Sequence, residues 1–132
     1  MLRALYEGVV FGHLCHIEKL RAAGAQIKAV RLTGGGSRSQ VWTQMFADTI
    51  QLPMEVSDGT ELGARGAALS AGIGTGAYRN YAEAVEQGVS IARVQEPNPA
   101  NTPFYLDRFA EYKQLIGVMQ EPWESLNKLG GQ

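Results

Sequence analysis

Apolar residues recur at helical spacing through the first twenty positions of the chain. They lie three or four residues apart, which places them on one side of an α-helix. The segment ends in the basic residue Arg21, and Gly24 follows as a typical helix stop. We therefore predict a long amphipathic helix, whose apolar positions are Leu2, Leu5, Tyr6, Val9, Val10, Ile17 and Leu20.

The period then changes from that of a helix to that of a strand. Single polar residues separate short apolar stretches from Ile27 to Leu32, and two of the apolar residues are β-branched, which is typical of a strand. Helical spacing returns after three glycines and runs to about Gln51, with Ser37 or Ser39 available as the N-cap.

Pro53 ends the second predicted helix, and a short strand follows at Met54 to Val56. We expect it to lie parallel to the first strand through a right-handed crossover. Downstream, Thr60 is a candidate cap for a helix rich in glycine and alanine, whose small residues favour close approach of a neighbouring element. The remaining predicted features are a break at Gly72, Gly74 and Gly76, a helix at Tyr81 to Gln87, a strand at Val89 to Gln95 and a final helix at about Phe104 to Met119.

Composition indicates one ordinary globular domain. The chain has 132 residues, of which 45% are hydrophobic and 19% charged, which is the length and composition of a single domain. With the elements predicted above, we expect residues 1–132 to form one domain with a core at 1–96 and the final helix at about 104–119. Twelve basic residues against thirteen acidic ones give a net charge of -1 without a basic run. This balance makes nucleic acid an improbable partner.

The single cysteine, Cys15, rules out an intramolecular disulfide and favours a cytoplasmic location. The apolar stretch from Val9 to Cys15 is interrupted by His13 and is much shorter than a membrane span. We therefore expect no membrane partner.

The glycine loop Gly34-Gly35-Gly36 lies between a predicted strand and a predicted helix. Backbone N–H groups at such a helix start, together with the helix dipole, favour binding of an anion, most often a phosphate. The alternative is a tight turn without a ligand. The glycines run into Ser37-Arg38-Ser39, so the Gly-Lys-Ser/Thr ending of a P-loop is missing.

A dinucleotide fingerprint is a second possibility for this loop. Gly34 and Gly36 match its first two glycines, but Ser39 stands at the third place. Asp58, after the second strand, imitates the acidic residue that binds a ribose. The long helix before the strand, and the lack of further strand and helix alternation, count against this reading.

The segments "TGGGSRSQVWTQMFADTIQLPMEV" and "ELGARGAALSAG" resemble the carboxy-terminal domain of the FGGY carbohydrate kinases. The resemblance covers Leu2 to about Gly76 and, more loosely, the final helix. Its matching positions are Glu7-Gly8, the loop Gly34 to Ser37, Gln44, Ala47-Asp48, Pro53, Glu61 and Gly66-Ala67-Ala68.

This resemblance implies an α/β fold that is part of an actin-like ATPase (ribonuclease H-like) domain. Its parallel strands have flanking helices, and the upstream antiparallel strands of that fold are missing from the chain. It also implies ATP with Mg²⁺ as cofactors, bound in a cleft between two domains. Carried over by position, Gly35 and Gly36 line the nucleotide, Ser39 reaches the adenine, and Gly34 and Ser37 shape the turn.

The same resemblance places the proton-accepting aspartate and the sugar-binding residues upstream of the matched segment. No catalytic residue is therefore assigned in this chain, and Asp48 and Asp58 are interpreted as helix and turn residues. The chain then corresponds to a carboxy-terminal part of a kinase. Arg65 departs from the family's usual apolar residue, and Glu61 favours the helix dipole or helps to hold the nucleotide loop.

Two further clusters receive structural interpretations. His13 and His16, with Cys15 between them, lack a third ligand on the same helix face, so no metal site is assigned. The aromatic residues Tyr105, Phe109 and Tyr112 recur at helical spacing and are expected in the core.

Three functional hypotheses remain at this point. The first is the ATP-binding carboxy-terminal domain of a kinase that phosphorylates a ketose or polyol through a missing amino-terminal domain, with ATP and ADP as ligands. The second is a non-catalytic nucleotide-binding or assembly module, and the third is a dinucleotide-binding oxidoreductase fragment. Because one sheet edge and part of the first helix would lack partners, we also expect a homodimer.

Overall fold

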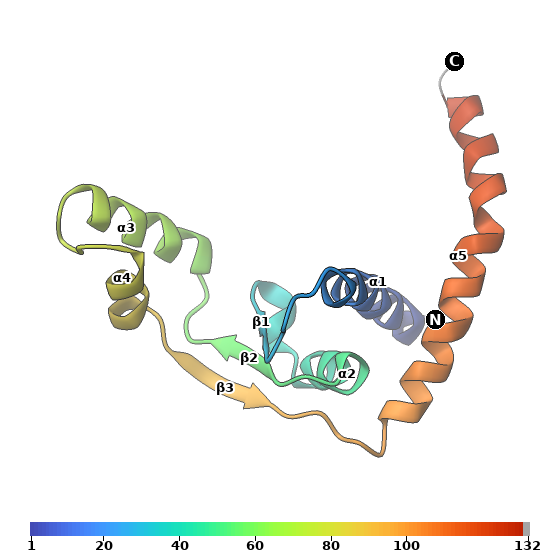
Figure 1. Ribbon diagram of the computed structural model, residues 1–132, viewed down its shortest axis with the longest axis horizontal. Coiled ribbons are helices and arrows are strands. Elements are labelled where there is room, and N and C mark those ends of the chain that lie inside the picture. The colour runs from blue at the N-terminus through green and yellow to red at the C-terminus, as the bar shows by residue number, and fades with distance from the viewer. Residues whose placement is uncertain (131–132) are drawn as a thin grey trace.

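A computed structural model describes residues 1–130 (Figure 1). The chain forms five α-helices, one 3-10 turn and three strands within that range. Their bounds are α1 Leu2–Ala22, β1 Val30–Leu32, the 3-10 turn η1 Gly35–Arg38, α2 Gln40–Ile50, β2 Met54–Ser57, α3 Leu62–Gly74, α4 Tyr81–Gly88, β3 Ile91–Gln95 and α5 Thr102–Gly130.

The three strands form one mixed sheet in the order β1-β2-β3. β1 and β2 are parallel, with Val30 opposite Met54, so the predicted parallel pairing is confirmed. β3 is antiparallel to β2 and places Gln95 opposite Met54. An antiparallel third strand does not continue the strand and helix alternation of a doubly wound dinucleotide-binding sheet.

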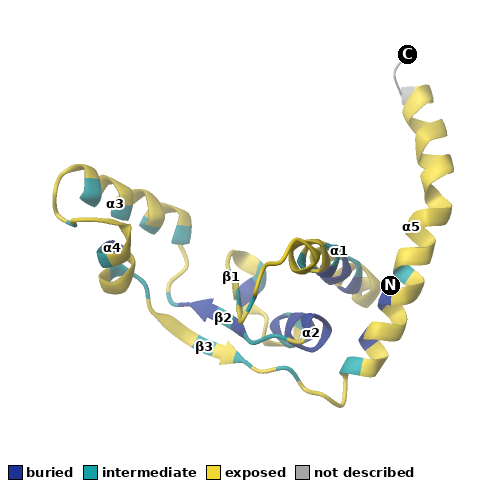
Figure 2. Ribbon diagram, in the orientation of Figure 1, coloured by how far each residue is buried: buried dark blue, intermediate teal, exposed yellow. Residues whose placement is uncertain are grey.

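The core lies where α1, α2, the sheet and the first turns of α5 meet (Figure 2). Tyr105 and Phe109 are buried there, which confirms the expectation for the aromatic residues of the final helix. On α1 the buried apolar residues are Val10, Phe11 and Leu14, whereas the predicted face residue Leu5 is 70% exposed. Part of the apolar surface of α1 therefore has no partner among the described residues.

Glu7 on α1 is a buried charged residue, and the hydrophobic pattern of the helix does not predict its burial. Its side chain is within the protein at 4% exposure. Arg3, one helical turn earlier, lies 2.8 Å from its carboxylate, and Arg108 on α5 lies 3.2 Å from it. Because a buried charge needs a compensating partner, this triad fixes α5 against α1.

The observed element boundaries differ from the predicted ones at several places. β1 begins at Val30 rather than Ile27, because β2 extends alongside it only from Met54 onward, and Val30 donates to the carbonyl of Pro53 at the start of the pairing. β3 begins at Ile91 rather than Val89. The N-cap of α3 is Glu61, not Thr60.

The ends of two helices can also be compared with the prediction. α3 continues through Gly72 and ends at Gly74, and Gly76 follows with φ 80°, so the predicted glycine break is confirmed at Gly74 and Gly76. α5 continues through Pro122 to Gly130, well past the predicted end at Met119. Figure 1 shows its second half projecting away from the body of the molecule.

Helices α3 and α4 pack on each other at the end of the sheet remote from α5 (Figure 1). A Cβ at Gly88 would meet the Leu69 side chain at 2.5 Å, and one at Gly72 would meet the Tyr78 ring at 2.7 Å. Close approach is thus present at these two glycines. At Gly63 and Gly66, however, no such neighbour lies within 4 Å among the described residues, so the predicted close approach is absent there.

Candidate functional site

The glycine loop forms a tight turn between β1 and α2. Gly34 has φ 87° and ψ -176°, a conformation that is essentially restricted to glycine. Its carbonyl accepts two hydrogen bonds from Ser37, one from the backbone N–H at 3.1 Å and one from the hydroxyl at 2.7 Å. Gly34 and Ser37 therefore close the turn, and the serine side chain is buried within it.

The other two glycines of the loop have different surroundings. A Cβ at Gly36 would lie 2.2 Å from the indole ring of Trp42, so packing inside the protein requires glycine at this position. A Cβ at Gly35 would meet no neighbour within 4 Å among the described residues, and this backbone is open to a ligand. Positive φ explains Gly34 alone, not Gly35 or Gly36.

Ser39 is the N-cap of α2. Its hydroxyl oxygen accepts a hydrogen bond from the backbone N–H of Trp42 at 3.2 Å, which confirms one of the two predicted caps. Its carbonyl accepts a 2.8 Å bond from the hydroxyl of Thr43. The start of α2, with its free N–H groups and the positive end of its dipole, thus directly follows the glycine turn.

Arg93 on β3 reaches the inner side of this turn, which sequence reasoning did not anticipate. Its Nη2 donates to the carbonyl of Ser37 at 2.5 Å and lies 3.3 Å from the hydroxyl of Thr43. The contact joins residues 56 positions apart. Period and composition carry no signal for such a pair.

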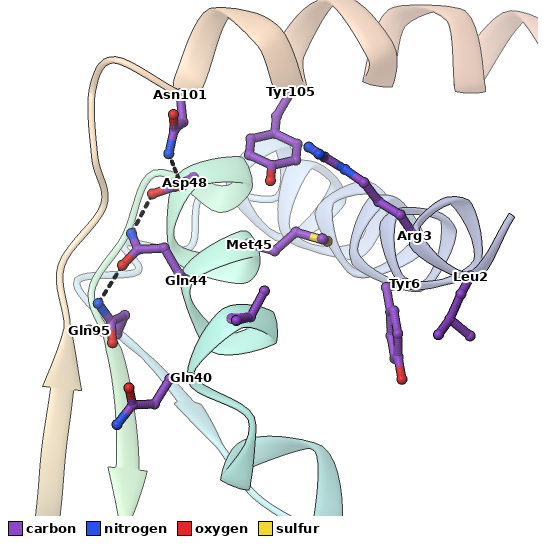
Figure 3. A pocket seen from close by; sticks show the side chains of 11 residues that line it. Leu2, Arg3, Tyr6, Gln40, Gln44, Met45, Asp48, Gln95, Asn101 and Tyr105 are labelled. Atoms are coloured by element: carbon purple, nitrogen blue, oxygen red, sulfur yellow. Dashed lines mark hydrogen bonds between the residues drawn. The ribbon is translucent and has the colours of Figure 1, made fainter.

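A cavity of about 420 Å³ opens beside the glycine turn. It is lined by Tyr6, Gly35, Gly36, Ser39, Val41, Trp42 and Met45. A larger cavity of about 640 Å³ shares Tyr6, Val41 and Met45 with it and extends between α1, α2 and the start of α5 (Figure 3). The predicted loop residues Gly35, Gly36 and Ser39 therefore border an open, mainly apolar groove, whereas Gly34 and Ser37 support it from within.

A chain of hydrogen bonds forms one wall of the larger cavity (Figure 3). Asp48 on α2 accepts from the side-chain amides of Gln44 at 2.6 Å and Asn101 at 2.8 Å, and Gln95 donates to the side-chain carbonyl of Gln44. Both oxygens of Asp48 are occupied. The interpretation of Asp48 as a structural helix residue is thus in accord with its contacts.

Tyr105 closes the same cavity from α5. Burial raises the pKa of its phenol above the ordinary value. The hydroxyl therefore remains a neutral hydrogen-bond donor and acceptor at physiological pH.

The remaining candidate residues are not among those that line the cavity beside the glycine turn. Asp58 forms an ion pair with Arg65 at 2.6 Å. Arg65, the residue that departs from the family pattern, therefore has a partner within this chain. The hydrogen bond from Arg65, followed by one involving Ser90, lowers the pKa of Asp58. Glu61 caps α3 without a side-chain cap bond.

His13 and His16 face each other with ring centroids 6.3 Å apart. Within residues 1–130 there is no group of three or more His, Cys, Asp or Glu residues that could hold a metal ion. In the same range, none of the helices combines the length and the apolar character needed to cross a membrane.

A strand, a glycine turn and a capped helix start beside a groove define an α/β protein with a candidate anion site. The model of the FGGY family of carbohydrate kinases, C-terminal domain, matches residues 1–75. The chain belongs to this family. The matched residues include α1, the glycine turn, α2 and β2.

Relatives that match over most of the chain are kinases by name. The chain is 38% identical over 120 residues to an L-xylulose/3-keto-L-gulonate kinase of Escherichia coli, covering 91% of this chain and 24% of that protein. It is 32% identical over 127 residues to an autoinducer-2 kinase of Salmonella typhimurium, covering 96% and 22%. The chain thus spans about a quarter of the length of the curated relatives that it matches.

Solved structures show the same arrangement of elements. A xylulose kinase from Rhodospirillum rubrum matches with a TM-score of 0.75 and 29% identity, over 92% of this chain and 24% of that one. A ligand-bound xylulose kinase from Lactobacillus acidophilus matches with a TM-score of 0.79 at 23% identity, over 89% and 24%. The second likeness concerns the fold alone.

Proposed function

We propose that this chain is the ATP-binding carboxy-terminal part of a sugar kinase, within an actin-like ATPase domain. The complete protein would transfer the γ-phosphate of ATP to a hydroxyl group of a ketose or polyol. The observation that carries the proposal is the glycine turn at the start of α2, which borders a cavity of about 420 Å³. The names of the relatives support a ketose as the substrate class.

Each loop residue has a distinct part in the proposed nucleotide site. Gly35 offers open backbone to the nucleotide, and Gly36 brings Trp42 against the turn. Gly34 and Ser37 keep the turn closed. The oxygen of Ser39 already accepts from Trp42, so its hydroxyl hydrogen is left to donate to an adenine ring nitrogen.

The residues around the turn do not fit a magnesium site. Mg²⁺ prefers carboxylate and other oxygen ligands, and the cavity beside the turn has no acidic side chain in its lining. We therefore assign no Mg²⁺ ligand to this chain. Mg²⁺ remains part of the proposal only as the usual companion of ATP in phosphoryl transfer.

The proposal also assigns the sugar-binding groups and the proton acceptor to another part of the complete protein. Asp48, the buried acid of α2, has both oxygens engaged and is held within the protein. The cytoplasm suits such a kinase, because ATP is available there and the free Cys15 stays reduced.

Titration with ATP, ADP and NAD tests the proposal. We expect weak binding of the adenine nucleotides, no preference for NAD, and no phosphorylation of xylulose, ribulose or glycerol by the chain alone. Phosphorylation should return when the amino-terminal domain is supplied. A preference for NAD would favour the oxidoreductase alternative, binding without restored activity would favour a non-catalytic module, and turnover by the chain alone would contradict the assignment of the base to another domain.

A further inference from the structure

We propose that Arg93 is a positioning residue that holds the glycine turn in its ligand-binding shape from β3. This inference rests on the proposed nucleotide site and adds a residue to it. Arg93 lies outside residues 1–75, the segment matched by the family model. The later part of the chain would then contribute directly to the geometry of the site.

Three groups meet on the inner side of the turn. Arg93 donates through Nη2 to the carbonyl of Ser37, with the Thr43 hydroxyl at 3.3 Å. Thr43 itself donates to the carbonyl of Ser39 at 2.8 Å and lies 3.4 Å from that of Ser37. The end of the 3-10 turn and the cap of α2 are therefore tied to one guanidinium group.

The bond to Ser37 is well suited to fix the turn. A hydrogen bond from a charged donor is stronger than one between neutral groups. Thr43 is a weaker donor to the Ser37 carbonyl than Arg93, because the Thr43 hydroxyl already donates to the carbonyl of Ser39 at the shorter distance. Since the peptide unit is planar, holding the Ser37 carbonyl also fixes the direction of the N–H of Arg38 on the other side of that unit.

No ion pair within the described part of the chain explains the placement of Arg93. Among residues 1–130, the ion pairs of the other arginines involve Glu7, Glu55, Asp58 and Glu83, and none involves Arg93. Its Nη1 is buried without a hydrogen-bond partner in the same range. The polar partners of Arg93 there are thus the turn and the first residues of α2.

The test uses the full 132-residue chain carrying Trp123→Phe, which leaves Trp42 as its single tryptophan. Trp42 lines the cavity beside the turn, so its emission follows ADP binding. Arg93→Met removes the donors but keeps much of the apolar stem, and Arg93→Lys keeps one charged donor. Arg79→Met is the matched control, because Arg79 has an 84% exposed side chain and pairs with Glu83 on α4.

We expect Arg93→Met to weaken ADP binding at least tenfold and to speed amide exchange in residues 35–39 at least tenfold without added nucleotide. Arg93→Lys should restore part of both, and Arg79→Met should match the parent. A role in overall stability alone would speed exchange throughout the core rather than in the turn. If Arg93→Met does not fold, Arg93→Gln serves instead, with changes of at least threefold expected in both measurements.

Parent-like ADP affinity and parent-like exchange in the turn of the folded variant would overturn the inference and leave the proposed function standing. Absence of ADP binding by the parent chain would instead contradict the proposed function and, with it, the role of Arg93 in ligand binding. Amide exchange would still decide whether Arg93 holds the turn.

Discussion

Asp48, on α2, accepts a 2.7 Å hydrogen bond from the backbone N–H of Asn98, fifty residues further along the chain. The same carboxylate accepts from the side chain of Asn101, and its backbone carbonyl lies 3.4 Å from the hydroxyl of Thr102. One buried acid therefore fixes the connection between β3 and α5 onto the helix that carries the glycine turn at its start.

Replacing Asp48 with alanine should destabilise the chain by about 3 kcal/mol. The change leaves the Asn98 N–H and the Asn101 side-chain amide without their acceptor, and the Gln44 amide keeps only the carbonyl of Glu96. A buried donor left without a partner lowers stability. Urea unfolding followed by circular dichroism measures the loss. Asp107→Ala, at an exposed position of α5, is the control and should change stability by less than about 0.5 kcal/mol.

Valine at Gly35 should abolish nucleotide binding and leave stability nearly unchanged. The position is open in the described structure, so the new side chain projects into the space proposed for the ligand. ADP titration and thermal unfolding of the variant provide the two measurements. Unchanged ADP affinity would mean that the open backbone of Gly35 does not face the nucleotide.

Valine at Gly36, unlike valine at Gly35, should mainly affect stability and lower it by about 2 kcal/mol or more, as overpacking does. Its side chain would enter the ring of Trp42, 2.2 Å from the Cβ position. Thermal unfolding and Trp42 emission should both change. A stable variant with parent-like emission would contradict the tight contact.

Replacing Asp58 with asparagine should lower the melting temperature at pH 6 by a small amount. Because Arg65 lowers the pKa of Asp58 below its ordinary value of 3.8, the ionised form contributes stability at pH values above that ordinary value. The contribution falls as the pH drops through the lowered pKa. The difference in melting temperature between the parent and Asp58→Asn should therefore shrink as the pH falls below about 4.

We propose that the isolated chain forms a dimer through β1 or the exposed side of α1. β1 is a sheet edge paired only with β2 in the described residues, and Leu5 on α1 is 70% exposed. Leu5→Glu should weaken the dimer, as measured by light scattering across a dilution series. Leu115→Glu on α5, at 62% exposure, is the matched control and should have no effect.

A charge at Val30 would be a less selective test of this dimer, because Val30 also packs against the core. A monomer at every concentration would contradict self-association. A dimer weakened only by Leu115→Glu would place the contact on α5.

Local features of the site were predictable from the sequence. The glycine turn, the cap at Ser39 and the parallel pairing of β1 with β2 all follow from residue preferences or from spacing over a few positions. The aromatic residues Tyr105 and Phe109 were also placed correctly in the core, because helical spacing marks a buried face without reference to its partner.

The features that sequence reasoning missed depend on distant partners. Glu7 is buried because Arg108, 101 positions away, compensates its charge together with Arg3. Arg93 meets Ser37 across 56 positions. The early start predicted for β1 was wrong for a related reason. β1 begins only where its pairing with β2 begins, and β2 is a separate segment of the chain.

Helices α3 and α4 are linked through β3 to the turn that we propose as the nucleotide site. Two peptide segments connect this pair to the sheet, and the N–H of Asp58 on one donates to the carbonyl of Ser90 on the other at 3.0 Å. The second segment continues directly into β3, on which Arg93 stands three residues beyond Ser90. A rotation of the pair would displace β3, and the Arg93 guanidinium group would transmit that displacement to the turn that we propose as the nucleotide site.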